Sequence, residues 1–82
     1  MASAVMELGL RGQTSGEALL ELGRFIDAAL LAGMHTVTII HGKGTGALRQ
    51  AVHGALRSHR QVASFRLGKY GEGEQGVTIV TL

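Results

Sequence analysis

A chain of 82 residues has room for one domain, and an apolar content of 45% supports a folded core rather than a disordered chain. The sequence contains no cysteine, which excludes a disulfide framework and a thiolate zinc site. Its apolar runs are shorter than the roughly 20 residues of a membrane helix, and no secretory signal pattern opens the chain, so we expect a cytoplasmic protein with no membrane contact.

The net charge of +2 hides an uneven distribution along the chain. Acidic residues stop at Asp27 and resume only at Glu72. All four histidines lie between these two positions, together with the basic residues Lys43, Arg49, Arg57, Arg60, Arg66 and Lys69. A stretch that carries only positive charges often binds a polyanion, and the alternative is a solvated face with no partner.

The first two predicted elements are a strand and an amphipathic helix. Residues 5–11 alternate in polarity and predict a strand with Met6, Leu8 and Leu10 on one face. After a turn, Thr14 and Glu17 have the spacing of a capping box, which predicts the start of a helix that stops at Gly33. The apolar stripe of this helix consists of Ala18, Leu19, Leu22, Ile26, Ala29 and Leu30.

The remaining elements follow in the order strand, helix, strand, strand. Residues 36–41 predict a strand buried on both faces, because Val37, Ile39 and Ile40 are all apolar. A second helix is predicted from residues 45–47 to about His59. Its apolar face is Leu48, Val52, Ala55 and Leu56, and a positive stripe of Arg49, His53, Arg57 and Arg60 lies opposite. Residues 62–67 and 77–82 predict two strands joined by an irregular, glycine-rich loop.

The order β-α-β-α-β-β predicts an α/β fold. With two helices and four strands, the economical arrangement is a two-layer sandwich with both helices on one face of a mixed sheet. The two strand-helix-strand units imply parallel pairing with right-handed crossovers, and the last two strands can form a hairpin. The other face of the sheet is then only partly apolar and is open to solvent or to a partner.

A glycine-rich loop connects the second predicted strand to the second helix. Residues 41–46, His-Gly-Lys-Gly-Thr-Gly, can direct successive backbone N–H groups and a helix N-terminus at an anion, which predicts a phosphate-binding site. The loop is not a Walker A motif, and its match to a dinucleotide-binding motif is weak because no acidic residue follows about 20 positions later. The alternative is a tight turn with no ligand.

The loop and its flanks, residues 39–49, resemble the Smr (small MutS-related) domain, especially the version at the end of the bacterial second-family MutS proteins. Residues 29–33, 64–68, 71–73 and 76–82 are also similar to that family. The resemblance implies a two-layer fold like the C-terminal domain of translation initiation factor three. It also implies binding of DNA, with RNA or the ribosome as further candidates, and in several members a nicking endonuclease activity.

The resemblance also makes residues 1–82 a single domain cut from the C-terminal end of a longer protein. That parent would carry an ATPase core in cis, which is absent from this sequence. The resemblance implies that such a parent acts in recombination suppression or in ribosome quality control.

One departure from the family pattern bears on catalysis. The first strand of the family typically reads Leu-Asp-Leu-His/Arg-Gly, whereas this chain has Leu-Gly-Leu-Arg-Gly at residues 8–12, so Gly9 replaces a candidate catalytic carboxylate. Glu7 points to the same side of the strand and is the candidate substitute. Two functions therefore stay open, a nicking endonuclease and a non-catalytic DNA- or RNA-binding module. Of the two, we favour the nuclease.

The candidate site residues follow from these interpretations. The candidate catalytic residues are His41, as general acid or base, Arg11, as a phosphate clamp, and Glu7. The candidate phosphate- and nucleic-acid-binding residues are Gly42, Lys43, Gly44, Thr45, Gly46, Arg49, Arg66, Lys69 and Tyr70. No resident metal site is predicted, and a magnesium or manganese ion stays open as a cofactor for cleavage. His53 is expected to be exposed surface.

Overall fold

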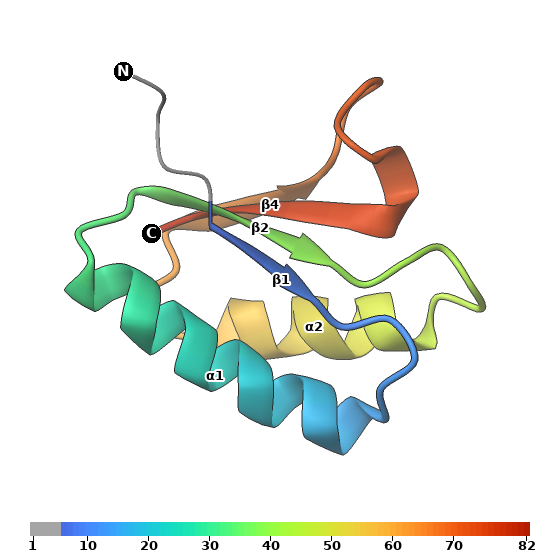
Figure 1. The fold of residues 1–82 in the computed structure, drawn as a ribbon, viewed down its shortest axis with the longest axis horizontal. Coiled ribbons are helices and arrows are strands. Elements are labelled where there is room, and N and C mark those ends of the chain that lie inside the picture. The colour runs from blue at the N-terminus through green and yellow to red at the C-terminus, as the bar shows by residue number, and fades with distance from the viewer. Residues whose placement is uncertain (1–5) are drawn as a thin grey trace.

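The computed structural model describes residues 6–82 as two layers, with both helices covering one face of a four-stranded sheet (Figure 1). The elements are β1 (Glu7–Gly9), α1 (Ser15–Leu31), β2 (Thr36–Ile40), α2 (Ala47–Ser58), β3 (Ser64–Leu67), the 3-10 turn η1 (Glu74–Gly76) and β4 (Val77–Thr81). The predicted α/β sandwich is confirmed. Val5, the first residue of the predicted first strand, lies outside the described residues. No helix within residues 6–82 has the length and apolar character needed to cross a membrane.

The sheet has the strand order β1-β2-β4-β3. β1 pairs with β2 in parallel, as predicted, but the parallel pairing expected for the second strand-helix-strand unit is wrong. β4 lies between β2 and β3 and is antiparallel to both. β4 suits the central position because Thr78 and Val80 are completely buried, whereas β3 exposes Ser64 and Arg66 and is better suited to an edge.

Helix α1 is closed at both ends by local interactions. The Thr14 hydroxyl accepts a hydrogen bond from the Glu17 backbone N–H, and the Glu17 carboxylate accepts one from the Thr14 N–H, which completes the predicted capping box. At the other end Gly33 has a φ of +73°, and the N–H groups of Gly33 and Met34 donate to the carbonyls of Leu30 and Ala29. This pattern is a Schellman motif, which favours glycine.

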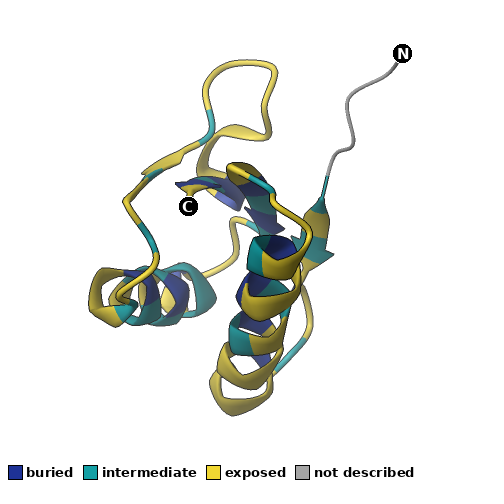
Figure 2. Ribbon diagram, turned by 90° about the vertical axis from the view of Figure 1, so that its left-hand side faces the viewer, coloured by how far each residue is buried: buried dark blue, intermediate teal, exposed yellow. Residues whose placement is uncertain are grey.

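The core lies between the helices and the sheet, where the buried surfaces of both layers face each other (Figure 2). It is formed by Leu10, Ala18, Leu22, Ile26, Ala29, Val37, Ile39, Val52, Leu56 and Val80. The prediction that β2 is buried on both faces is wrong in part, because Ile40 is only half-buried on the face without helices. Leu19, assigned to the buried stripe of α1, is 38% exposed.

The topology brings the N-terminal ends of both helices and residues 41–46 to one end of the molecule. β1 and β2 are parallel, and β3 has the same direction because both β2 and β3 are antiparallel to β4. The two connecting helices therefore also run in the same direction, and their N-terminal ends lie together at the end where residues 41–46 leave the sheet (Figure 1). The shared direction of β1, β2 and β3 therefore brings residues 41–46 next to the two helix N-termini.

The capping box provides the first test of this fold. We expect Thr14→Ala to lower the free energy of unfolding by about 1 kcal/mol, because the N–H of Glu17 loses its acceptor. Urea denaturation measures the change. Ser15→Ala is the matched control, since Ser15 is also exposed in the first turn but makes no capping bond. Equal destabilisation by both substitutions would contradict the assigned cap.

Candidate functional site

Residues 41–46, here called the glycine loop, form one wall of a cleft of about 370 Å³. The cleft is lined by residues 12–15, which lead into α1, and by residues 41–49, which lead into α2. Gly42, Gly44 and Gly46 all have positive φ, at +82°, +31° and +86°. This backbone conformation is open to glycine and costly for other residues, so it is the glycines that allow the loop to take this course.

The N-cap residue of α2 provides no side-chain hydrogen bond to the helix. Gly46 occupies the capping position, no acidic residue lies in the first turn, and the Thr45 hydroxyl accepts from the Ala47 N–H at 3.3 Å. α1 differs, because Glu17 already compensates the positive end of that helix. The backbone N–H groups and the dipole of α2 therefore make its N-terminus a favourable place for an anion.

Three basic side chains surround the loop. A β-carbon placed on Gly46 would lie 3.0 Å from a guanidinium nitrogen of Arg49, so that side chain folds back over the start of α2. A β-carbon on Gly42 would lie 3.0 Å from Cγ of Arg11, and one on Gly76 would lie 3.4 Å from Cγ of Lys43. Within residues 6–82, none of these three cations forms an ion pair with a carboxylate. Their charges are available to a ligand.

A second hollow of about 330 Å³ lies beside the same loop, and Ile40 on the helix-free face of the sheet is among its lining residues. It is lined by Arg11, Ile40, Gly42, Lys43, Gly73, Gly76 and Val77. Because Gly42 and Lys43 line both hollows, the backbone of the loop forms the wall between them. The positive charge near the loop therefore faces two adjoining hollows.

His41 is buried beneath the loop, with 4% of its surface exposed. Its Nδ1 lies 2.9 Å from the Gly42 carbonyl oxygen, and its Nε2 lies 2.8 Å from the Thr78 hydroxyl. Both ring nitrogens are therefore engaged within the protein. In this arrangement the imidazole anchors the start of the loop to β4.

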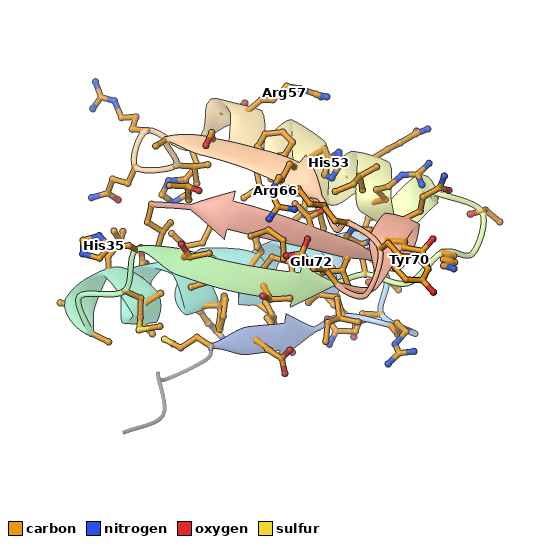
Figure 3. The ribbon with its side chains drawn as sticks, turned by 90° about the horizontal axis from the view of Figure 1, so that it is seen from above. His35, His53, Arg57, Arg66, Tyr70 and Glu72 are labelled. Carbon is orange, nitrogen blue, oxygen red and sulfur yellow. The ribbon has the colours of Figure 1, made fainter. Side chains whose placement is uncertain are left out.

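His53 does not have the exposed surface position expected from the sequence. It is half-buried, its Nε2 lies 2.7 Å from the same Thr78 hydroxyl, and its ring centroid lies 4.9 Å from that of Phe65. Burial lowers the pKa of His53, and electrostatic repulsion from the neighbouring His41, Arg57 and Arg49 side chains lowers it further. Figure 3 shows His53 on α2, with Arg57 further along the same helix.

The structure does not bring Glu7 to the loop. Glu7 is exposed at the start of β1 and pairs with Thr38 in the middle of β2, whereas Arg11 lies beyond the end of β1 and beside Gly42 of the loop. Gly9 pairs with Ile40 on the helix-free face, whereas His41 lies on the helix side, since its Nε2 shares the Thr78 hydroxyl with His53 of α2. A carboxylate at position 9 and the imidazole of His41 would therefore lie on opposite faces of the sheet.

Three further candidates, Arg66, Lys69 and Tyr70, belong to β3 and the loop that follows it. The guanidinium nitrogens of Arg66 lie 2.8 and 3.3 Å from the two carboxylate oxygens of Glu72, and the two side chains meet in Figure 3. The Arg66 hydrogen bonds and the Lys69 backbone N–H hold the pKa of Glu72 at about 2, so Glu72 neutralises Arg66 throughout the neutral range. Tyr70 is 95% exposed. In the described part of the chain, no three histidine, aspartate or glutamate side chains gather as a metal-ligand group.

Comparison with known proteins finds one family along almost the whole chain. The model of the Smr domain matches residues 8–82. Endonuclease MutS2 of Caldicellulosiruptor bescii is 58% identical over 77 residues, and Endonuclease MutS2 of Geobacillus kaustophilus is 54% identical over 81 residues. These alignments cover 94% and 99% of this chain but only 10% of either relative, so the chain spans about a tenth of the length of the curated relatives that it matches.

Solved structures agree with this assignment. The Smr domain of Thermus thermophilus MutS2 superimposes with a TM-score of 0.93 at 50% identity, covering 95% of this chain and 98% of that domain. YdaL, a stand-alone small MutS-related protein from Escherichia coli, superimposes with a TM-score of 0.88 at 29% identity. That match covers 93% of this chain and 63% of YdaL.

Gly44 tests whether the loop conformation matters to ligand binding. A β-carbon at Gly44 meets no atom within 4 Å, so Gly44→Ala introduces backbone strain, on the order of 1–3 kcal/mol, without a clash. We expect the variant to keep its circular dichroism spectrum and to bind an oligonucleotide about tenfold more weakly. Gly54→Ala, an equally open position within α2, is the control and should bind normally. Unchanged binding by Gly44→Ala would show that the loop is only a turn.

Proposed function

This chain belongs to the Smr domain family, and on that premise we propose that it binds the sugar–phosphate backbone of nucleic acid at the glycine loop and nicks the phosphodiester held there. One observation carries the proposal. The uncapped N-terminus of α2 and the cations Arg11, Lys43 and Arg49 surround a single loop that is hollowed on both sides. An anion of phosphate size fits both the charge and the open backbone N–H groups.

The binding half of the proposal follows from the chemistry of these contacts. Backbone amides and guanidinium groups recognise phosphate oxygens, which every nucleotide carries, so affinity should depend little on base sequence. Arg66 contributes less than its charge suggests, because Glu72 already occupies its guanidinium. Tyr70, with 95% of its surface exposed, is free to stack on a base or sugar next to the bound phosphate.

The cleavage half is supported by the relatives named Endonuclease MutS2. Water would attack phosphorus, the P–O bond to the leaving oxygen would break, and the proton lost by the water would reach that leaving oxygen through solvent. The developing negative charge would be stabilised by the loop amides and Arg11, while Lys43 would hold the phosphate in the bound state. His41 supports this chemistry by holding the loop, since both of its ring nitrogens already have protein partners. The geometry thus favours charge stabilisation over direct proton transfer by His41, which revises the role expected from the sequence.

A non-catalytic binding module is the second candidate. Two observations favour it: Gly9 lacks the carboxylate of the family pattern, and Glu7 lies too far along β1 to replace it. In that case the domain holds nucleic acid for the remainder of a MutS2-type parent, whose ATPase core we propose to act in cis, in the cytoplasm. The targets would be recombination intermediates or, in ribosome quality control, RNA.

Salt dependence and one substitution test the binding half. Raising the salt concentration from 50 to 200 mM should weaken oligonucleotide affinity about a hundredfold, because bound phosphates release condensed counterions. Lys43→Ala should lower affinity and reduce the salt slope, whereas Arg24→Ala, an exposed cation on α1, should change neither. Fluorescence anisotropy measures both quantities. An affinity that barely changes with salt would rule out phosphate-directed binding.

A supercoiled-plasmid assay tests the cleavage half. We expect the wild-type protein to nick the plasmid, and Lys43→Ala to recover most of the rate at saturating substrate because its main defect is in binding. The same assay with EDTA shows whether a divalent cation takes part. Gly9→Asp restores the family carboxylate at an open position. If neither the wild type nor Gly9→Asp nicks under any metal condition, the binding module replaces the nuclease as the function.

A further inference from the structure

A hydrogen-bonded chain of three side chains runs beneath the glycine loop, from His41 through Thr78 to His53. The Thr78 hydroxyl is completely buried and lies 2.8 Å from Nε2 of His41 and 2.7 Å from Nε2 of His53. The three residues come from the end of β2, from β4 and from α2. Neither Thr78 nor His53 has a part in the phosphate-binding surface itself.

The chemistry of the groups fixes where each proton lies when both imidazoles are neutral. The Gly42 carbonyl can only accept a hydrogen bond, so Nδ1 of His41 carries the hydrogen and Nε2 of His41 is an acceptor. Thr78 must then donate its single hydroxyl hydrogen to Nε2 of His41. The Thr78 oxygen in turn accepts from the N–H at Nε2 of His53. No other arrangement satisfies all three contacts.

We propose that Thr78 and His53 are positioning residues that hold His41 in its Nδ1–H form and connect this buried imidazole to solvent as a proton relay. The inference rests on the proposed function, because His41 holds the Gly42 carbonyl and so the loop that grips phosphate. The Gly42 carbonyl requires the hydrogen on Nδ1 of His41, and Thr78 supports this form by donating to Nε2. His53 directs the Thr78 hydrogen toward His41 by donating to the Thr78 oxygen.

The relay can deliver a proton without breaking a contact. A solvent proton binds Nδ1 of the half-buried His53, the hydrogen on Nε2 of His53 passes to the Thr78 oxygen, and the Thr78 hydrogen passes to Nε2 of His41. Each of the two transfers inside the protein breaks one bond to hydrogen and forms another. At the end His53 is neutral again, every hydrogen bond still has a donor and an acceptor, and His41 carries the positive charge.

The surroundings of the relay suit this direction of transfer. The charged groups that face His53 are Arg49 and Arg57 of its own helix. The other titratable group beside it is the imidazole of His41 at the end of β2, while β3 contributes the uncharged ring of Phe65. These positive charges, together with burial, disfavour a proton that stays on His53. The negative charge of a phosphate bound at the loop would attract the proton that the relay carries, so the relay couples nucleic-acid binding to proton uptake.

Imidazole ¹⁵N NMR on histidine-labelled protein tests the assignment without any ligand. The expected spectrum shows His41 protonated at Nδ1 and His53 protonated at Nε2, with the His41 ring signals identified from their loss in His41→Gln. Thr78→Val should shift the Nε2 signals of both His41 and His53, because each nitrogen loses its hydrogen-bond partner, whereas Thr78→Ser should keep the wild-type spectrum because it retains the hydroxyl. Thr81→Val, on the exposed face of the same strand, is the matched control.

Oligonucleotide affinity, measured between pH 5.5 and 8, gives the functional readout. Thr78→Val and His53→Leu should each weaken binding about tenfold and flatten its pH dependence, because buried donors or acceptors lose their partners. Thr78→Ser, and His53→Gln with its side-chain N–H, should bind within a few-fold of wild type. His35→Leu, an exposed histidine at the other end of the sheet, is the control for His53→Leu (Figure 3).

The outcomes separate this inference from the function on which it rests. A wild-type His41 protonated at Nε2 alone would overturn the relay, whatever the protein binds. The expected tautomers together with unchanged affinity and pH profile in Thr78→Val and His53→Leu would overturn the positioning role. The expected tautomers in a protein that binds no nucleic acid would leave the hydrogen-bond assignment standing and contradict the proposed function. If Thr78→Val fails to fold, the wild-type and Thr78→Ser measurements decide the assignment, and His53→Leu against His53→Gln decides the role.

Discussion

The site depends on a single backbone acceptor, the carbonyl oxygen of Gly76. It accepts hydrogen bonds from the N–H of His41 at 3.1 Å and from the N–H of Gly42 at 2.9 Å, and so holds the start of the glycine loop against the beginning of β4. The close approach leaves little room, since a β-carbon on Gly76 would lie 3.4 Å from the Lys43 side chain and 3.6 Å from the Gly42 backbone. Gly76 is the last residue of the η1 turn. Its two hydrogen bonds therefore attach the segment between β3 and β4 to the glycine loop.

With the loop held in this position, basic side chains line a hollow on each of its two sides. Above it, Arg11 and Lys43 line a hollow next to the helix-free face. Below it, the uncapped start of α2 and Arg49 line the cleft toward α1. His41 is buried beneath the loop, where its Nε2 is hydrogen-bonded to the buried hydroxyl of Thr78. The backbone of the loop can therefore present positive charge on both sides while its position is fixed from within.

Local features of the fold could be predicted from the sequence because they depend on neighbouring residues. The capping box of Thr14 and Glu17 and the end of the helix at Gly33 each follow from the side chains, or the missing side chain, at those positions. The two-layer architecture could also be predicted, because the alternation of strand and helix patterns leaves few ways to bury both apolar helix faces.

Contacts between distant residues could not be predicted in the same way. The insertion of β4 between β2 and β3 depends on competition among strands for the central position, which pattern alone does not decide. The bond between His53 and Thr78 joins residues 25 positions apart and requires the packing of α2 on that sheet order. The separation of Glu7 from the loop likewise depends on the register of β1 with β2. Residue type suggested candidate chemistry, and the pairing of strands decided which candidates meet.

Backbone amide NMR during titration with a single-stranded oligonucleotide tests the central claim, that the glycine loop between two helix N-termini holds a nucleic-acid phosphate. The account predicts that the largest shifts fall on residues 12–15 and 41–49, the two walls of the cleft. They should also saturate together and weaken as salt is raised. Shifts confined to the helix-free face around Thr38, Arg66 and Ile79, with the loop amides unchanged, would contradict it.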